Sequence, residues 1–170
     1  GIPILRTLSG SALMEGGSFA WINERTAVIG CGIRVNREGA EQVGEVLKRQ
    51  GVELLIIDLF GYDLHIDGSF QMISKDLAIV DPFGLPYSFL QKLKELKVQT
   101  VEISPADDRW IINSLAVAPG ELLMPEGASN QTLDALAKHG VSWTVIPYGK
   151  MQLNGGGIHC STTPLIRDPV

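Results

Sequence analysis

The sequence predicts an α/β fold made of one repeated unit, in which two short strands precede a helix and a third strand. A stretch that begins Gly17-Ser18-Phe19 returns as Gly68-Ser69-Phe70, and a fainter copy begins at Asn113-Ser114-Leu115. Each copy is followed by apolar residues at helical spacing and then by an apolar strand. Because the matched residues recur in order, we interpret the pattern as a true repeat rather than the loose periodicity common in α/β proteins.

The first repeat is placed at about residues 10–60 and begins with two short strands around the polar turn Asn23-Glu24-Arg25. A helix is expected after Asn36, a favourable N-cap, because apolar residues follow at helical spacing (Ala40, Val43, Val46 and Leu47). Gly51 stands where helices commonly end, and a strand is expected over residues 52–59.

The second and third repeats, at about 64–104 and 110–148, show the same order of elements. Their strands after the helix are expected over residues 98–103 and 141–146, and residues 149–170 form a C-terminal segment. The helices are indicated by two apolar stripes: Phe89, Leu90, Leu93 and Leu96, and Leu133, Leu136 and Ala137.

Composition narrows the class of protein. The 170 residues are 45% hydrophobic and carry a formal net charge of −5, which suits one globular domain rather than a disordered chain. Basic residues are few and scattered, so no nucleic-acid partner is expected. No apolar stretch approaches the ~20 residues of a membrane span, and no membrane association is expected. Two cysteines make no disulfide framework, so a reducing cytoplasm is the expected compartment.

Cys160 follows three consecutive glycines, and a cysteine beside such a loop is a candidate nucleophile when a base takes its proton. The alternative is a flexible loop that ends in a small buried cysteine.

His65 and Asp67 would share one face of a strand, which places an acid/base beside a carboxylate suited to a cationic substrate. The alternative is a solvated strand edge. Glu15, beside two glycines, could orient a histidine, or could simply belong to a turn.

Other candidates carry less. Cys31 lies between two glycines after a strand, but the third glycine of a dinucleotide-binding loop is absent, and a buried structural cysteine is expected. His139 is interpreted as structural, at a helix end. No cysteine and histidine cluster has metal-ligand spacing, so neither a metal nor a cofactor is expected.

Three motifs occur in a telling order: Glu15-Gly16-Gly17, then His65 to Phe70 (His-Ile-Asp-Gly-Ser-Phe), then the segment Gly155 to Pro169 that contains Cys160. Over nearly the whole chain, this order resembles the guanidino-group-modifying, or pentein, superfamily. That superfamily contains arginine deiminases, dimethylarginine dimethylaminohydrolases and amidinotransferases. The resemblance implies a five-bladed α/β propeller of ββαβ repeats, of which residues 1–170 would form about three, as a portion of a single catalytic domain.

The resemblance also implies roles for individual residues. Cys160 would be the nucleophile, His65 the general acid/base, and Glu15 the carboxylate that completes the catalytic set. Asp67 would grip the guanidinium group. Arg34 would hold a substrate carboxylate, although an ion pair at the surface is an equal alternative for it.

The implied activity is hydrolysis of an arginine-like guanidine through a covalent cysteine intermediate. The alternatives are amidino transfer to an acceptor amine and, with less support, a non-catalytic binding protein on the same fold. The implied partner is a small guanidino substrate such as arginine. With two repeats apparently missing at the N-terminus, association with a missing part or with further copies of the chain is expected. The thiolate of Cys160, beside His65 and a cationic substrate, is expected to form below the free-cysteine pKa of ~8.5.

Overall fold

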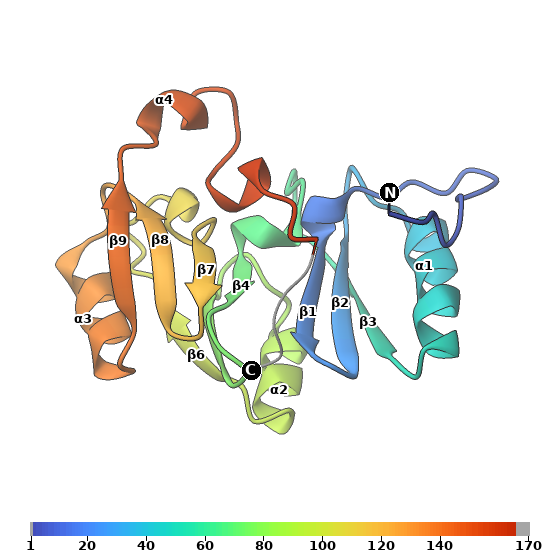
Figure 1. Ribbon diagram of the computed structural model, residues 1–170, viewed down its shortest axis with the longest axis horizontal. Helices are drawn as coiled ribbons and strands as arrows, with labels where there is room; N and C mark the ends of the chain where they lie inside the picture. The colour runs from blue at the N-terminus through green and yellow to red at the C-terminus, as the bar shows by residue number, and fades with distance from the viewer. Residues whose placement is uncertain (1, 166–170) are drawn as a thin grey trace. The chain divides into compact units, whose positions relative to one another are not determined.

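Each repeat forms a three-stranded sheet and one helix, in the order strand, strand, helix, strand (Figure 1). The computed structural model describes residues 2–165; the last five residues of the predicted C-terminal segment lie outside this range. In every repeat the first two strands are antiparallel, and the third strand joins the second in parallel. The predicted α/β fold of ββαβ repeats is therefore confirmed for three repeats.

The described residues divide into two compact units between Ile66 and Asp67. Unit 1 contains the first repeat, and unit 2 contains the second and third repeats with the C-terminal segment. The elements of unit 1 are η1 (Gly16–Ser18), β1 (Phe19–Asn23), β2 (Thr26–Cys31), α1 (Arg37–Arg49) and β3 (Glu53–Asp58).

Unit 2 contains two repeats. After η2 (Ile66–Gly68), which begins at the division, the second repeat is β4 (Phe70–Met72), β5 (Leu77–Val80), α2 (Tyr87–Glu95) and β6 (Gln99–Glu102). The third repeat is η3 (Arg109–Ile111), β7 (Leu115–Ala118), β8 (Glu121–Pro125), α3 (Asn130–Lys138) and β9 (Ser142–Ile146). The C-terminal segment adds α4 (Gly149–Gln152) and η4 (His159–Ser161), two short helices that apolar periodicity cannot predict.

The middle strand of each sheet carries most of the core. All residues of β2 and β5 are buried, as expected for short strands that are covered on both faces. In unit 1, α1 packs on its sheet through Ala40 and Leu47 (Figure 1). In unit 2, Phe89 of α2 meets Phe70 of β4 edge to face, with ring centroids 5.2 Å apart. One apolar cluster in unit 2 joins residues of both repeats, including Ile79, Leu122 and Leu136.

Three helix ends show the expected capping chemistry, whereas the C-terminal end of α2 does not. The Asn36 side chain accepts a hydrogen bond from the Gly39 amide at 2.8 Å, which confirms the predicted N-cap. Gly51 and Gly140 follow α1 and α3 with φ of +75° and +72°, a conformation that glycine adopts at little cost. After α2 the equivalent residue is Lys97, whose φ is +61°. A side chain is thus held in a left-handed conformation at this helix end.

A buried serine precedes the first strand of every repeat: Ser18, Ser69 and Ser114 are each at most 1% exposed. Each serine hydroxyl is hydrogen-bonded, to the Leu64 carbonyl, to the Arg109 guanidinium and to the Ile111 carbonyl, respectively. These serines fix the position at which each first strand begins. The segments just before them therefore hold equivalent places in the three repeats, and these segments carry several of the candidate site residues.

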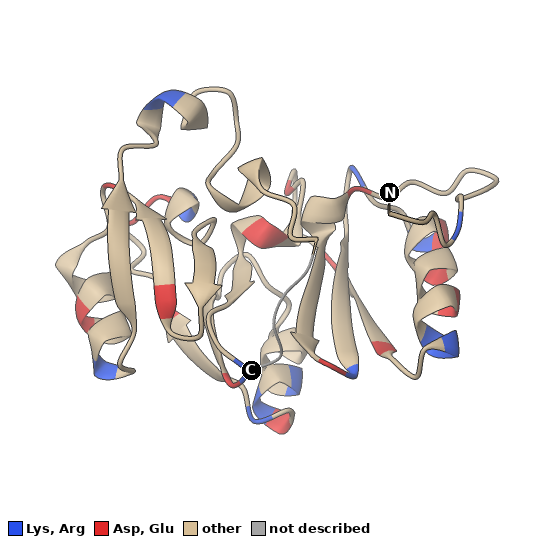
Figure 2. Cartoon of the chain, viewed as in Figure 1, with Lys and Arg blue, Asp and Glu red and all other residues tan. Residues whose placement is uncertain are grey.

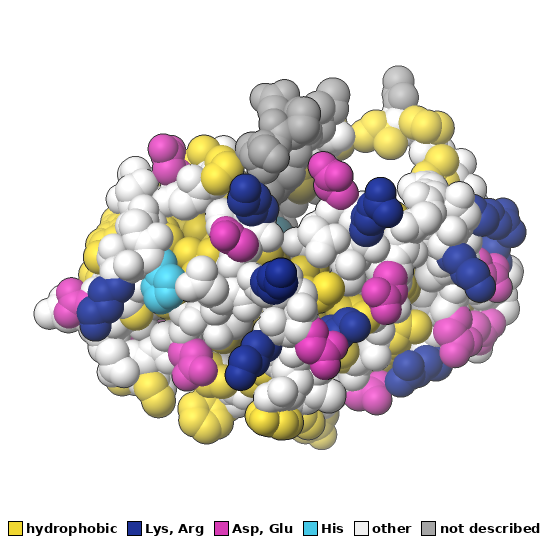
Figure 3. Space-filling view, turned by 90° about the horizontal axis from the view of Figure 1, so that it is seen from below, with side chains coloured by type: hydrophobic (Ala, Val, Ile, Leu, Met, Phe, Trp, Pro, Cys, Tyr) yellow, Lys and Arg dark blue, Asp and Glu magenta, His cyan; other side chains and the backbone are white. Residues whose placement is uncertain are grey.

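Charges are interspersed on the surface. Figure 2 shows acidic and basic residues together on helix α1, and the face in Figure 3 mixes both signs. Within residues 2–165, no helix combines the length and the apolar character needed to cross a membrane.

Candidate active site

Unit 1 contains a histidine and carboxylate pair. Glu15 lies just before η1, and its Oε2 is 2.7 Å from Nε2 of His65. Arg34 forms an ion pair with the other carboxylate oxygen, Oε1, at 3.7 Å. An ion pair was one of the two roles considered for Arg34 from the sequence. The Glu15 carboxylate is thus shared between an imidazole and a guanidinium, and it can fix the orientation of the imidazole ring.

Gly17 makes room for this histidine. A Cβ atom on Gly17 would lie 2.6 Å from Nδ1 of His65, whereas a Cβ on Gly16 would meet nothing within 4 Å. The two glycines of the motif therefore differ. The second is required by the close approach of the imidazole ring, and it gives a physical reason for a glycine two residues after Glu15.

Unit 2 contains the cysteine. Cys160 lies in η4 and is exposed, and its thiol donates a hydrogen bond to Oδ2 of Asp67 at 3.4 Å. Asp67 lies in η2 and is only 5% exposed. The same carboxylate oxygen is 3.2 Å from Nδ1 of His159. A buried carboxylate therefore stands beside a thiol that solvent can reach, an arrangement that favours a cationic ligand.

Alternation along a strand predicted that His65 and Asp67 share one strand, but they do not. His65 precedes η2 and Asp67 lies within it, because the strand of this repeat begins only at Phe70. The expectation of a shared strand face is therefore wrong. His65 belongs to unit 1 and Asp67 to unit 2, and each is held by the contacts of its own unit.

The pKa of the Cys160 thiol is raised, mainly because the sulfur is partly withdrawn from water, although the residue as a whole is exposed. The charge of Asp67 and the hydrogen bond to its carboxylate raise it further. Hydrogen bonds from the Gly157 backbone and the Asn113 side chain act in the opposite direction. The lower pKa expected for this thiol beside His65 and a cationic substrate stays a prediction; Asp67, the anionic neighbour that faces the sulfur, acts against it.

Two residues near the sulfur were missed in the sequence. Asn113 Nδ2 lies 3.1 Å from Sγ of Cys160, and His159 shares the Asp67 carboxylate. His159 could have been found from its position next to Cys160. Asn113 could have been found because it stands where the first two repeats have a glycine.

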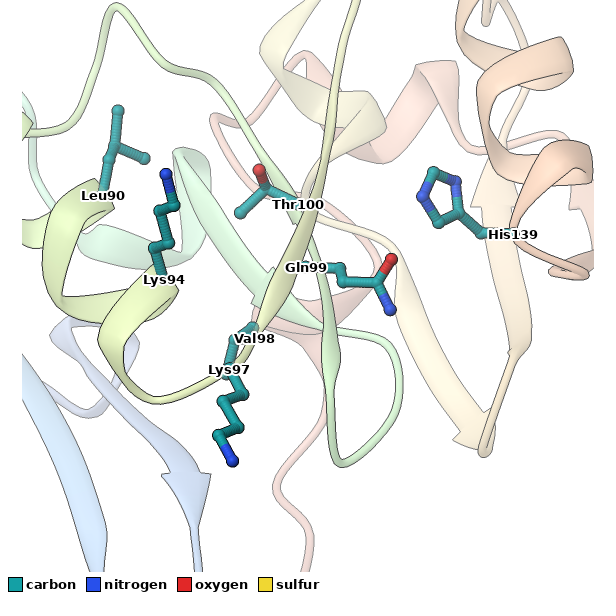
Figure 4. Close-up of a pocket in the computed structure, with 7 residues that line it drawn as sticks. All are labelled: Leu90, Lys94, Lys97, Val98, Gln99, Thr100 and His139. Atoms are coloured by element: carbon teal, nitrogen blue, oxygen red, sulfur yellow. The ribbon is translucent and has the colours of Figure 1, made fainter.

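The remaining candidates are placed as structural. Cys31 is buried, as predicted, and burial raises the pKa of its thiol. His139 caps the end of α3 and its Nδ1 is 2.9 Å from the Ala135 carbonyl oxygen. A shallow pocket of unit 2 is lined by residues from α2, β6 and this helix end, among them Lys94 and Lys97 (Figure 4). None of the predicted site residues lines it. Among residues 2–165, no three acidic, histidine or cysteine side chains group as a metal site.

The comparisons with known proteins agree on one fold. No family model matches the chain. Arginine deiminase of Listeria welshimeri is 24% identical over 194 residues, which cover 91% of this chain and 47% of the relative. The chain thus spans about half the length of this curated relative.

Solved structures give the same result. Dimethylarginine dimethylaminohydrolase of Pseudomonas aeruginosa, in complex with citrulline, superposes with a TM-score of 0.74 at 18% identity, over 90% of this chain and 56% of that one. SxtG, an amidinotransferase of Microseira wollei, gives 0.77 at 17% identity, over 91% and 48%. The N-terminal domain of the cyanobacterial arginine dihydrolase ArgZ gives 0.75 at 18% identity, over 88% and 55%. The fold of this chain is that of the guanidino-group-modifying (pentein) superfamily.

Proposed function

We propose that the chain carries the cysteine half-reaction of an enzyme that hydrolyses an arginine-like guanidine. The observation that carries this proposal is the buried Asp67 carboxylate with the reachable Cys160 thiol hydrogen-bonded to it. A guanidinium group that replaces the imidazole of His159 on Asp67 would bring its carbon toward Sγ. It would also offset the negative charge that raises the pKa of the thiol.

The proposed chemistry has two steps. Sγ of Cys160, once deprotonated, bonds to the guanidinium carbon, and the departing amine leaves with a proton supplied by His65. Water, deprotonated by His65, then adds to the same carbon. The carbon–sulfur bond breaks, the sulfur recovers its proton, and a ureido product such as citrulline leaves. The Glu15 carboxylate, 2.7 Å from Nε2 of His65, holds this imidazole in position. The exposed Arg34 is proposed to bind a substrate carboxylate.

The second candidate is an amidinotransferase, in which an acceptor amine replaces the water. It is favoured by the similarity to SxtG, which covers as much of this chain as the similarity to the hydrolases. Incubation with arginine, with and without glycine, separates the two. Citrulline is expected for the hydrolase, whereas ornithine with guanidinoacetate would identify the transferase. If neither product forms and partner binding survives Cys160→Ala, the non-catalytic alternative holds.

The guanidinium-binding role of Asp67 has its own test. Asp67→Asn keeps the shape of the side chain and removes its charge. Loss of a charge-assisted hydrogen bond worth ~1.5–3 kcal/mol predicts that arginine binds about tenfold to a hundredfold more weakly. Asp76→Asn is the matched control, because Asp76 is exposed in the same unit and bonds Ser74. Equal binding of arginine by both variants and the unchanged chain would contradict the role.

A further inference from the structure

The third repeat departs from the other two at one position. Gly17 and Gly68 stand immediately before the buried serines of the first and second repeats, whereas Asn113 stands before Ser114 in the third. Asn113 is 1% exposed. The third repeat therefore buries a polar side chain at a position where the other two repeats have a glycine. The contacts of this side chain indicate its role.

Every polar atom of the Asn113 side chain is used, and each contact leads to the cysteine or its neighbours. Oδ1 accepts a hydrogen bond from the Cys160 amide at 3.1 Å, while Nδ2 donates to Sγ of Cys160 at 3.1 Å. Nδ2 also donates to the Asp67 carbonyl at 3.3 Å, and the Asn113 carbonyl accepts from the His159 amide at 3.0 Å. One residue thus fixes the backbone and the sulfur of Cys160 together.

The glycine loop is shaped to this side chain. A Cβ on Gly157 would lie 2.3 Å from Oδ1 and 2.7 Å from Cβ of Asn113. A Cβ on Gly156 would meet only Cβ of Cys160, at the ordinary contact distance of 3.8 Å. Only a residue without a side chain at position 157 lets the loop approach the buried amide so closely.

We propose that Asn113 is a positioning residue for Cys160: its amide orients the sulfur and donates the hydrogen bond that the thiolate needs. The inference rests on the proposed role of Cys160 as nucleophile. The titratable groups that face this sulfur are Asp67, hydrogen-bonded to it, and His159, on the same carboxylate. Asp67 opposes formation of the thiolate, so the neutral donor on Asn113 matters more here than it would beside a cation.

The test is the pH profile of Cys160 alkylation by iodoacetamide, followed by mass spectrometry of the Cys160 peptide in the 170-residue chain. Asn113→Ala removes the donor without adding a charge. A rise of about one pKa unit is expected, and with it a rate at pH 7 that is about tenfold lower. A purely structural asparagine predicts the reverse, because a loosened loop exposes the thiol and speeds alkylation.

Gly157→Ala supplies a second variant in case Asn113→Ala does not fold by circular dichroism. It should shift the alkylation profile upward in the same way, because its Cβ displaces the Asn113 amide, whereas Gly156→Ala should leave the profile unchanged. An unchanged or faster profile in a folded Asn113→Ala or Gly157→Ala variant overturns the inference. The readout needs no turnover, so a chain that shows these shifts but forms no product from guanidines contradicts the proposed function and leaves the positioning role standing.

Discussion

Replacing Gly17 with alanine tests how tightly the structure holds His65. The new Cβ would lie 2.6 Å from Nδ1, whereas ordinary contact begins at 3.4 Å, so the ring must move by about 0.8 Å or the turn must open. The hydrogen bond between Nε2 and Glu15, now 2.7 Å, cannot survive such a shift unless the carboxylate follows. Overpacking of this kind costs about 1–3 kcal/mol of unfolding free energy. For the proposed role of His65 in catalysis, a displacement near 1 Å predicts a turnover lower by as much as ~100-fold.

Two measurements follow the change in Gly17→Ala. Urea unfolding gives the loss of unfolding free energy, and the ¹⁵N signals of the His65 side chain report whether its bond to Glu15 persists. Gly16→Ala is the matched control, since its Cβ meets nothing within 4 Å, and it should stay within about 0.5 kcal/mol of the unchanged chain. If Gly17→Ala is as stable as Gly16→Ala and the His65 signals do not move, the close approach of the imidazole has no energetic consequence.

Three further predictions concern stability. Lys97→Gly should raise the unfolding free energy by about 0.5–1 kcal/mol, because φ is +61° at this residue and glycine adopts that conformation at little cost. As a control, Lys94→Gly inside α2 should lower the unfolding free energy by about 1 kcal/mol. Urea midpoints that fall in both variants would refute this prediction. Asn36→Ala should lower the unfolding free energy by about 1–2 kcal/mol, because Oδ1 of Asn36 accepts hydrogen bonds from the amides of Gly39 and Leu13. Asn154 is exposed, so Asn154→Ala should leave the unfolding free energy unchanged. Equal losses in the two variants, measured by urea unfolding, would contradict the role of Asn36 as a cap. Both thiols have a raised pKa in the folded chain, so their contribution to stability is complete below the unfolded value of about 8.5 and is lost as pH rises through the folded values. The fall in stability above about pH 8.5 should be smaller in a Cys31→Ala, Cys160→Ser double variant, and an identical fall would refute the assignment.

The architecture was predictable from sequence because the residues that recur in the repeats are ones that the fold requires. Ser18 and Ser69 are buried at the start of equivalent strands, and Gly51 adopts the positive φ that ends its helix. These requirements are local, so they leave a pattern that one sequence displays. The strand expected over residues 98–103 was accordingly found as β6, within one residue at each end.

The site was predictable only in part. Cys160, His65 and Asp67 stand in motifs with distinctive neighbours, but the strand expected at His65 and Asp67 was wrong because η2 occupies part of that stretch. Asn113 acts on Cys160 across 47 positions of sequence, and spacing alone carries no information about such a contact. The raised pKa of Cys160 depends on the same tertiary contacts and could not be read from the motif.

The central claim, that Cys160 is the nucleophile toward a guanidinium carbon, is tested most directly by mass spectrometry of acid-quenched mixtures of the chain with arginine. Hydrolysis through the proposed intermediate predicts an adduct of about 157 Da on the Cys160 peptide, which is arginine less ammonia, and amidino transfer predicts about 42 Da. Neither mass should occur on the Cys31 peptide or in Cys160→Ser. An adduct on Cys31 but not on Cys160, or product formation that persists undiminished in Cys160→Ser, would contradict the claim.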